Sequence, residues 1–285
     1  MAQSRQVSEI IEGKPTIEGA GVRLRRVFGF HSPERFDPFL LLDAFGSKEP
    51  LDYLAGFPWH PHRGIETITY LLDGLVEHGD SLGNSGVING GDVQWMTAGS
   101  GIIHQEMPKP GPSGEMWGFQ LWANLPASHK MMDPRYRDLT RDRIPEVTLD
   151  EAVLVKVIAG RLGETRGPMD DIVIEPELLD VSMPGGAAFS HPTRRGHKVF
   201  AYVFEGEAST GGRGVTQGQL ALFDDGDSIQ ITAGREGARF LLASGKPLKE
   251  PIAWRGPIVM NTQEELALAF REYQEGTFVK KGRPI

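Results

Sequence analysis

The chain has 285 residues, a formal net charge of −8 and no cysteine. At about twice the usual domain length, it is expected to form two domains rather than one. The acidic balance, without a cluster of basic residues, argues against a broad nucleic-acid-binding face. The lack of cysteine excludes disulfides, thiolate catalysis and cysteine-ligated metal centres.

The composition also bears on where the protein works. The first residues, as far as Gly21, lack the apolar stretch of a signal peptide, and no apolar run is long enough to span a bilayer. A cysteine-free chain fits a reducing compartment. We therefore expect a cytoplasmic protein with neither a membrane nor a nucleic acid as its direct partner.

The opening part of the chain predicts short strands joined by turns. The 36 glycines and 20 prolines are spread along the sequence and divide it into short segments. Strands are expected over residues 7–11 and 22–30. Arg23, Arg25 and Arg26 lie among apolar residues of the second strand, and a solvated strand face is favoured over an anion site for them.

The segment His60-Pro61-His62 begins a further strand and carries two potential metal ligands. Proline restricts itself and the preceding residue to extended conformations, and it is found at the start or edge of a sheet strand. The run over residues 63–72 is rich in β-branched and aromatic residues and ends at the turn pair Asp73-Gly74. Because side chains two residues apart point to one face of a strand, both imidazoles face the same way.

His104-Gln105-Glu106 is a second pair of potential ligands at the same spacing, after a Gly-Ser-Gly turn and before Pro108. A lone histidine is more often structural, but two such pairs on expected strands weigh against coincidence. Side by side, the strands would aim three imidazoles and one carboxylate at one point and leave open positions for water, dioxygen or a substrate. This donor set suits one divalent metal, with iron, manganese, zinc, nickel and copper all open.

The segments around these pairs are less distinctive. His78 falls in a polar, glycine-rich link and is expected to be exposed. Residues 115–125 alternate as a strand on which Gln120 and Trp122 share a face, and ordinary packing is favoured over a pocket lining for them. The charged, proline-containing stretch 127–150 is interpreted as the connection between domains.

The second half of the chain repeats the first. Residues 70–74 correspond to residues 202–206, and residues 95–99 correspond to residues 230–234, which predicts two copies of one antiparallel β-unit. The positions that correspond to the four potential ligands are Pro192, Arg194, Arg239 and Leu241. None of these is a good ligand, so the second copy is expected to be structural and metal-free, although His191 and His197 lie nearby.

The end of the chain predicts a helix. Thr262 and Glu265 have the spacing of a capping box, and Gly276 can end the helix. An apolar stripe at helical spacing is expected to dock on the protein's own sheet, and it consists of Leu266, Phe270 and Tyr273.

Several of these stretches resemble the pirin family of the cupin superfamily. The likeness covers nearly the whole chain, is strongest in the first half, and is carried by Gly56–Thr67, Gly91–Glu106, Asp37–Leu41, Gln120–Trp122 and Gly256–Thr262. The resemblance implies an all-β bicupin with two antiparallel, jelly-roll-like β-barrel domains and a short C-terminal helix. We expect an N-terminal metal-binding cupin domain over residues 1–140 and a degenerate cupin domain with the terminal helix over residues 141–285.

The resemblance also implies a site and an activity. One metal, usually iron and therefore expected as Fe(II), would be held by His60, His62, His104 and Glu106, and Glu106 is the expected catalytic base. Several members act as dioxygenases on the flavonol quercetin, which predicts a small aromatic or enediol substrate together with O2. Other members are regulators, so the alternative is a non-catalytic, iron-binding, redox-responsive module that acts through a protein partner.

Glu66 leaves one ambiguity. In many cupins the glutamate of the first motif is the carboxylate ligand, and counting alternate residues from His60 puts Glu66 on the same strand face. In pirins the ligand lies at the position of Glu106 instead. We follow the pirin pattern and expect Glu66 to form a hydrogen bond to a ligand imidazole.

Overall fold

The computed structural model describes residues 3–280, which form two compact units. The first unit comprises Lys14–Arg141 and residues 248–280, and the second comprises residues 3–13 and Asp142–Pro247. The internal boundary lies beside the expected division at 140/141. Each end of the chain, however, belongs to the unit built mainly from the other half, so the terminal helix is part of the first unit and not of the second.

The first unit is built from antiparallel strands with short helical segments between them. Its elements are β2 (Lys14–Glu18), β3 (Val22–Phe28), α1 (Pro33–Phe36), β4 (Phe39–Ser47), η1 (Pro50–Asp52), β5 (Phe57–His62), β6 (Ile65–Asp73), β7 (Leu75–Asp80), β8 (Ser85–Asn89), β9 (Val93–Thr97), β10 (Ile102–Lys109), β11 (Met116–Asn124), η2 (Ala127–His129), β12 (Arg135–Leu139), β23 (Ala253–Arg255), β24 (Ile258–Met260) and α2 (Gln263–Gln274).

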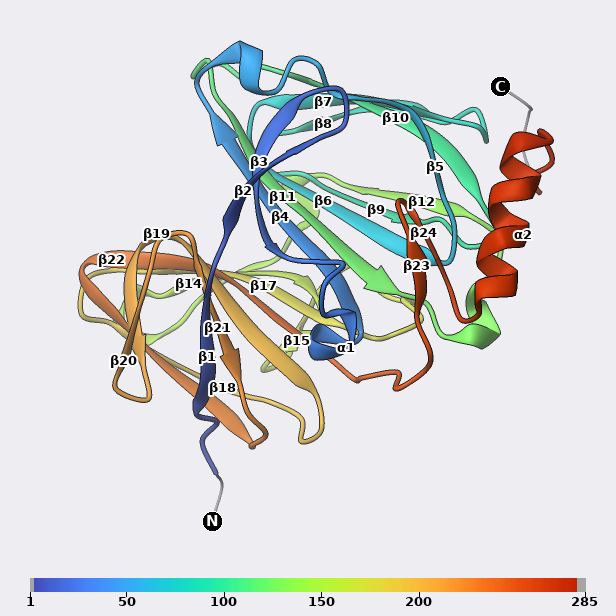
Figure 1. The fold of residues 1–285 in the computed structure, drawn as a ribbon. Helices are drawn as coiled ribbons and strands as arrows, with labels where there is room; N and C mark the ends of the chain where they lie inside the picture. The colour runs from blue at the N-terminus through green and yellow to red at the C-terminus, as the bar shows by residue number, and fades with distance from the viewer. Residues whose placement is uncertain (1–2, 281–285) are drawn as a thin grey trace. The chain divides into compact units, whose positions relative to one another are not determined.

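Most strands of this unit belong to two sheets that face each other (Figure 1). In the described part of the chain, the larger sheet has the order β12-β9-β6-β11-β4-β3-β2 and the smaller one has the order β5-β10-β7-β8. The sheets stay open and do not close into the expected barrel. Gly64, at a φ of 78°, turns the chain between β5 and β6, so these consecutive strands enter different sheets.

Apolar side chains fill the space between these two sheets. One cluster joins Leu71 of β6 to Val76 of β7, and another joins Ile65 of β6 to Ile102 of β10. The residues of β6 from Ile65 to Leu71 are all buried, which explains why this strand is a continuous run of β-branched and aromatic residues. The clusters hold the inner faces of the sheets together around the polar groups described below.

The second unit forms one large antiparallel sheet, with β1 from the start of the chain at its edge beside β21. In chain order its elements are β1 (Val7–Glu12), β13 (Glu146–Thr148), η4 (Asp150–Ala152), β14 (Leu154–Ala159), β15 (Arg161–Leu162), β16 (Thr165–Arg166), β17 (Glu177–Met183), β18 (Ala188–Pro192), β19 (Lys198–Thr210), β20 (Arg213–Thr216), β21 (Gln219–Phe223) and β22 (Ser228–Gly245), and η3 (Arg141–Arg143) lies at the boundary. The long strands β19 and β22 pair with each other over most of their length, and their inward residues form one core.

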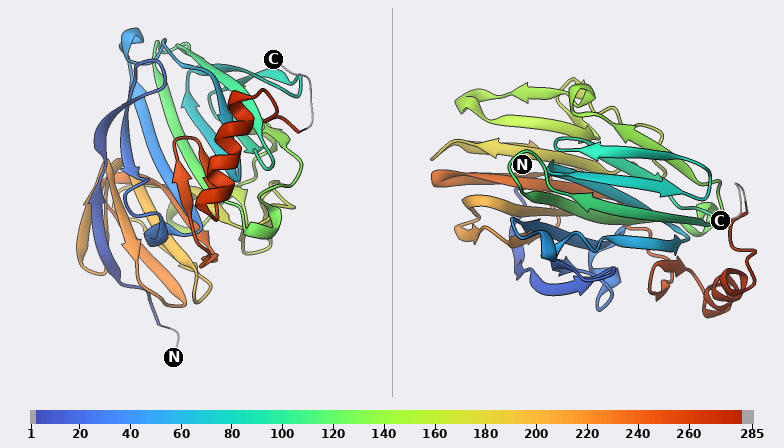
Figure 2. Two further views of the ribbon diagram at one scale, coloured as in Figure 1. Left: turned by 45° about the vertical axis from the view of Figure 1, so that its right-hand side comes forward. Right: turned by 90° about the horizontal axis from the view of Figure 1, so that it is seen from above.

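Helix α2 begins as the sequence predicts. Thr262 Oγ1 accepts a hydrogen bond from Glu265 N at 3.1 Å, and the Glu265 carboxylate accepts from Thr262 N at 3.0 Å. The helix packs on the β23–β24 hairpin of the first unit through Leu266 and Ala269 (Figure 2), whereas Tyr273 remains 39% exposed. Within residues 3–280, neither helix is long and apolar enough to cross a membrane.

Candidate metal centre

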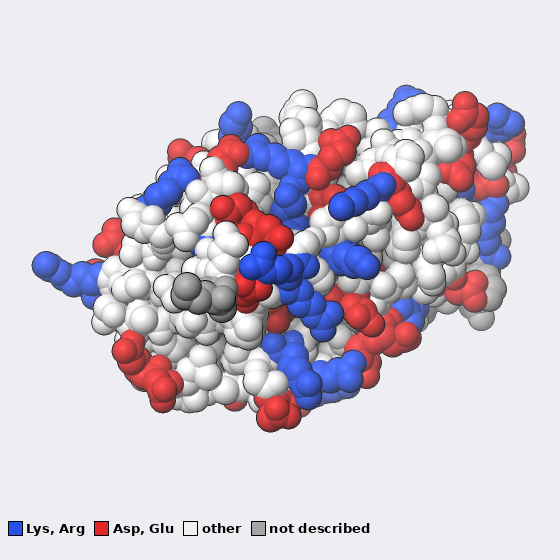
Figure 3. Space-filling view, turned by 90° about the horizontal axis from the view of Figure 1, so that it is seen from below, with Lys and Arg blue, Asp and Glu red and all other residues white. Residues whose placement is uncertain are grey.

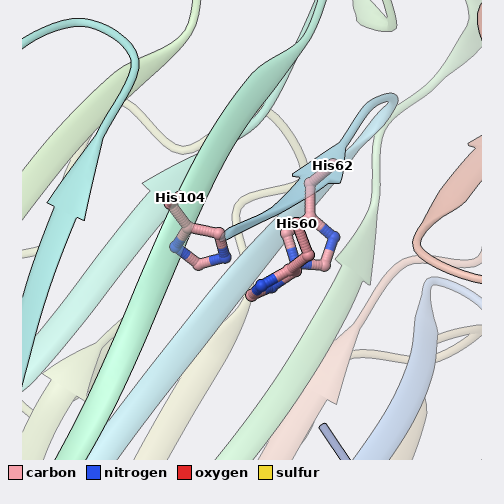
Figure 4. A group of neighbouring side chains, drawn as sticks. All are labelled: His60, His62 and His104. Carbon is pink, nitrogen blue, oxygen red and sulfur yellow. The ribbon is translucent and has the colours of Figure 1, made fainter. Parts of the chain in front are cut away.

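Strands β5 and β10 bring the two predicted ligand pairs together. They are antiparallel neighbours in the smaller sheet, and His104 lies opposite His60 in their register. A bulge follows, because Glu106 lies opposite Phe57, so β5 carries an extra residue there. Figure 4 shows His60 and His62 on one strand and His104 on the other, with the three rings turned toward one another.

The three imidazoles form a tight group, in which His60 is only partly buried. One ring nitrogen from each lies within 4.8 Å of the other two, and the Nε2 atoms of His60 and His62 are 3.0 Å apart. His62 and His104 are almost completely buried, and His104 Nε2 has no hydrogen-bond partner among the described residues. Within residues 3–280, this is the one group of three or more histidine and acidic side chains that could hold a metal ion.

Each ring is held from outside the group by its other nitrogen. His60 Nδ1 lies 2.8 Å from the carbonyl oxygen of Pro58, and His62 Nδ1 lies 3.1 Å from the carbonyl oxygen of Pro257. His104 Nδ1 lies 3.2 Å from the hydroxyl of Tyr136. A carbonyl can only accept, so His60 and His62 carry their protons on Nδ1 and present bare Nε2 lone pairs to each other. This is the arrangement in which metal-binding histidines are usually fixed.

The electrostatics of the group fit a bound cation. Burial lowers the pKa of His60, and it lowers the pKa of His62 and His104 well below the usual value, so the rings are neutral. Two nitrogen lone pairs at 3.0 Å repel each other unless a positive centre lies beside them. The residues present therefore fit a divalent metal that accepts neutral imidazole nitrogen.

Glu106 lies next to the three histidines but farther from them than they lie from one another at their closest. Its Oε2 is 4.0 Å from His104 Nε2, and its Oε1 accepts a hydrogen bond from Thr69 Oγ1 at 3.1 Å. Burial raises the pKa of the Glu106 carboxyl to about 7, against the lowering effect of the Thr69 hydrogen bond. The Glu106 carboxylate therefore lies beside the histidine group.

Glu66 does not reach a ligand imidazole, although the sequence predicts that it does. It lies on the regular part of β6, an odd number of residues from Thr69, so the two side chains point to opposite faces of the sheet. Thr69 contacts Glu106, whereas Glu66 Oε1 accepts a hydrogen bond from Thr97 at 2.7 Å. Counting alternate residues from His60 fails because the turn at Gly64 separates β5 from β6. We therefore leave Glu66 out of the site.

A cavity of about 560 Å³ opens from the histidine group within the first unit. His60, His62 and Glu106 line one part of it, and Trp122, Trp254 and Phe30 form aromatic walls. Gln120 and Trp122 line the cavity, so ordinary packing is not their whole role. Trp122 does pack against the core cluster that contains Ile65, as the sequence predicts. Arg26 also lines the cavity and pairs with Asp43, so the solvated face favoured for it is wrong as well.

Three residues around the histidines, His78, Tyr136 and Pro257, are not predicted by the sequence to lie there. His78 is buried on β7, opposite Glu106, and stacks on the Tyr136 ring at 5.2 Å between centroids, although the sequence predicts it in an exposed loop. Tyr136 and Pro257 contact the histidines from distant parts of the chain. No local spacing signals such contacts, because they depend on tertiary packing alone.

Two of the corresponding positions of the second unit, Arg239 and Leu241, have structural roles, whereas Pro192 and Arg194 are exposed. Arg239 pairs with Asp180 at 2.8 Å and with Glu205 at 3.1 Å, and Leu241 is buried. His191 is buried, and its Nε2 lies 3.0 Å from Glu177 Oε2, so this ring nitrogen already has a partner. In its described residues, the second unit has no group of three potential ligands.

A chain of two antiparallel β units, with converging histidines between the sheets of one, has the architecture of a bicupin protein. Residues 21–123 match the family model described as Pirin, and residues 178–279 match that of the Pirin C-terminal cupin domain. The chain belongs to the pirin family.

Individual relatives agree with this membership. The chain is 43% identical to a pirin-like protein of Caulobacter vibrioides, covering 96% of this chain and 99% of that one. It is 38% identical to pirin of Homo sapiens, covering 96% and 94%. A crystal structure of quercetin 2,3-dioxygenase from Acinetobacter baumannii superposes with a TM-score of 0.90 at 30% identity, covering 97% of this chain and 99% of that one.

Proposed function

We propose that His60, His62, His104 and Glu106 hold one divalent metal, with Fe(II) as the first choice and manganese, zinc, nickel or copper as alternatives. The observation behind this proposal is the convergence of buried, neutral imidazole nitrogens, each ring being fixed by a partner on its far side. Glu106 would complete the set by a small shift from its hydrogen bond with Thr69.

We propose further that the protein is a dioxygenase that opens the central ring of quercetin or a related flavonol or enediol with O2. The cavity beside the histidines is large enough for a fused-ring ligand and has aromatic walls. The named Acinetobacter relative supports the same substrate class. When bound, the metal would polarise the substrate's hydroxyl and lower its pKa.

The side chains of this site would then control the proton and the substrate. Glu106, whose pKa burial raises to about 7, would accept the hydroxyl proton. Trp122, whose ring lies 5.1 Å from that of His62, would stack against the substrate beside the ligands. Both atoms of O2 would enter the product, the flavonol's ring would open and carbon monoxide would leave, which balances atoms and electrons.

Oxygen uptake with a flavonol in metal-loaded protein tests this proposal. The expected result is consumption of one O2 and release of one CO per flavonol, stopped under argon and slowed by about 100-fold in Glu106→Gln. Full activity in Glu106→Gln would remove the role of Glu106 as the base. Oxygen uptake no faster than that of free metal in buffer would overturn the dioxygenase.

A second candidate is a non-catalytic, iron-binding module whose redox state alters a surface that a protein partner recognises. Trp59, which is 43% exposed and directly precedes His60, favours this candidate, because a change at the metal could reach the surface through one peptide unit. Binding of a partner that changes between the reduced and oxidised iron forms, without flavonol turnover, would support it over the dioxygenase.

A further inference from the structure

A row of polar side chains crosses the larger sheet of the first unit. Its members lie directly opposite one another on neighbouring strands, from β3 through β4, β11, β6 and β9 to β12. They are Arg26, Asp43, Gln120, Thr69, Gln94 and Asp138. Directly opposed residues share a face of a sheet, and the contact of Thr69 with Glu106 identifies this face as the inner one.

The row connects the candidate metal centre with the far part of the cavity. Thr69 Oγ1 lies 3.1 Å from Glu106 Oε1 and 3.0 Å from Gln120 Oε1. Gln120 lies opposite Asp43, and Asp43 lies opposite Arg26. Three members of the row, Arg26, Asp43 and Gln120, line the cavity, as Glu106 does. A ligand that fills the cavity therefore meets this polar row away from the histidines.

The outer end of the row offers hydrogen-bond acceptors. The Asp43 carboxylate accepts hydrogen bonds from Arg26 Nε at 2.8 Å and from Nη2 at 2.7 Å. The Glu18 carboxylate accepts one from Arg26 Nη1 at 2.7 Å. All three guanidinium nitrogens are thus already bonded to carboxylates, whereas each carboxylate oxygen can accept a further hydrogen bond. Two carboxylates face one guanidinium, so this end has a net negative charge. On the face of the molecule drawn in Figure 3, basic and acidic side chains are interspersed.

The walls between the two ends suit a flat ring. Trp122 lies 6.0 Å from Trp254, and Phe30 lies 5.5 Å from Trp254, between ring centroids. All three residues line the cavity. A planar aromatic ligand can stack along these walls, with one end at the histidines and the other at the carboxylates.

We propose that Asp43, held by Arg26, acts with Glu18 and Gln120 as a subsite for neutral hydroxyl groups on the distal ring of the substrate and rejects carboxylated rings. This inference rests on the proposed function, because it names the substrate class of that same site: planar, uncharged polyphenols with hydroxyl groups at both ends. A phenolic hydroxyl donates to a carboxylate, whereas a carboxylate on the ring would meet charge of its own sign.

The test uses flavonols that carry two, one or no hydroxyl groups on the distal ring, and one with a carboxylate there. Their binding to the full chain is followed by quenching of tryptophan fluorescence, metal-free and metal-loaded, under argon so that no turnover occurs. We expect the dihydroxy compound to bind about tenfold more tightly than the unsubstituted one, and the carboxylate to bind most weakly. Affinities equal within twofold across the series would overturn the inference.

Asp43→Asn isolates the carboxylate, and Asp52→Asn is the matched control, because Asp52 pairs with Arg23 outside the cavity lining. Asp43→Asn is expected to reduce the tenfold preference to about threefold or less, and Asp52→Asn is expected to keep it. An unchanged preference in folded Asp43→Asn would contradict the subsite.

If that variant does not fold, Glu18→Gln decides, since this side chain is 40% exposed. It is expected to improve binding of the carboxylated flavonol about threefold, and no improvement would count against the proposal.

The two proposals fail in different ways. Hydroxyl-dependent binding without oxygen uptake in metal-loaded protein would contradict the proposed dioxygenase activity and support the proposed subsite. Turnover of all the flavonols with indistinguishable affinities would support the proposed dioxygenase activity and contradict the proposed subsite.

Discussion

His62 Nδ1 lies 3.1 Å from the carbonyl oxygen of Pro257, a residue 195 positions later in the chain. The first unit therefore needs the chain beyond Leu248 to orient one of its histidines. Arg63, the next residue after His62, strengthens this connection. Its buried guanidinium pairs with Glu272 of α2 at 2.7 Å, donates to the carbonyl of Phe278 at 2.8 Å and lies over the Phe278 ring.

Glu272→Gln is expected to lower the free energy of unfolding by about 2 kcal/mol, because it leaves the charge of buried Arg63 without its partner. Partial burial opposes ionisation of Glu272, but Lys280 and Arg63 lower its pKa below the usual value. A carboxyl with a lowered pKa stabilises the fold above its unfolded pKa, and this contribution is lost as pH falls through the folded pKa. The difference between wild type and variant should therefore shrink in acid. Urea titrations at several pH values, with exposed Glu275→Gln as control, measure it; a pH-independent difference would contradict the account.

Gly64 is expected to tolerate no side chain. Its φ is 78°, and a Cβ there would overlap the carbonyl oxygen of Val259, which Lys130 Nζ contacts at 2.9 Å. Gly83 has a φ of 89° but open space around it, so Gly83→Ala carries the backbone strain without the clash. We expect a loss of about 1 kcal/mol for Gly83→Ala and about 3 kcal/mol or more for Gly64→Ala in chemical denaturation. Equal losses would show that the contact with Val259 is unimportant.

Tyr136→Phe is expected to weaken metal binding about tenfold, because it removes the hydroxyl beside His104 Nδ1 and keeps the ring that stacks on His78. Competition with a chromophoric chelator gives the affinity. Tyr273→Phe, at a 39% exposed position of α2, is the control. An affinity unchanged in Tyr136→Phe would mean that the hydroxyl does not hold the ring in place.

Metal affinity is expected to rise with pH from about 5.5 to 7.5. Burial raises the pKa of Glu106 to about 7 in the metal-free protein, so below that pH a metal must displace its proton. The raised pKa of Glu106 also affects folding stability. Between the unfolded pKa and about 7, the folded state keeps a proton on Glu106 that the unfolded state releases, so the metal-free protein loses stability as pH rises toward 7. Glu106→Gln should flatten both profiles, which chelator competition and thermal unfolding would follow. Profiles identical to wild type would exclude Glu106 from binding.

Short-range patterns were sufficient for the local features of the site. The spacing of His60 and His62 on one strand, with His104 on the next, predicts that the three rings come together, because strand side chains alternate strictly. The same rule failed for Glu66, since it holds only within one strand and Gly64 interrupts it. The capping box at Thr262 also follows from local residue types.

Long-range features required the structure. Whether Arg26 faces solvent or a cavity depends on Asp43 of the neighbouring strand and on the aromatic walls opposite. The crossing of the chain ends into the other unit depends on strand pairing between segments as distant as β1 and β21. Open sheets and closed barrels also share one alternation of residues, so the sequence could not distinguish them.

The metal content of the protein tests the central claim most directly. After incubation with Fe(II) under argon and removal of free metal, elemental analysis should find about one metal per chain in wild type and in exposed His129→Ala, but less than about a tenth in His104→Ala. Equal metal content in wild type and in folded His104→Ala would contradict a centre built from His60, His62, His104 and Glu106.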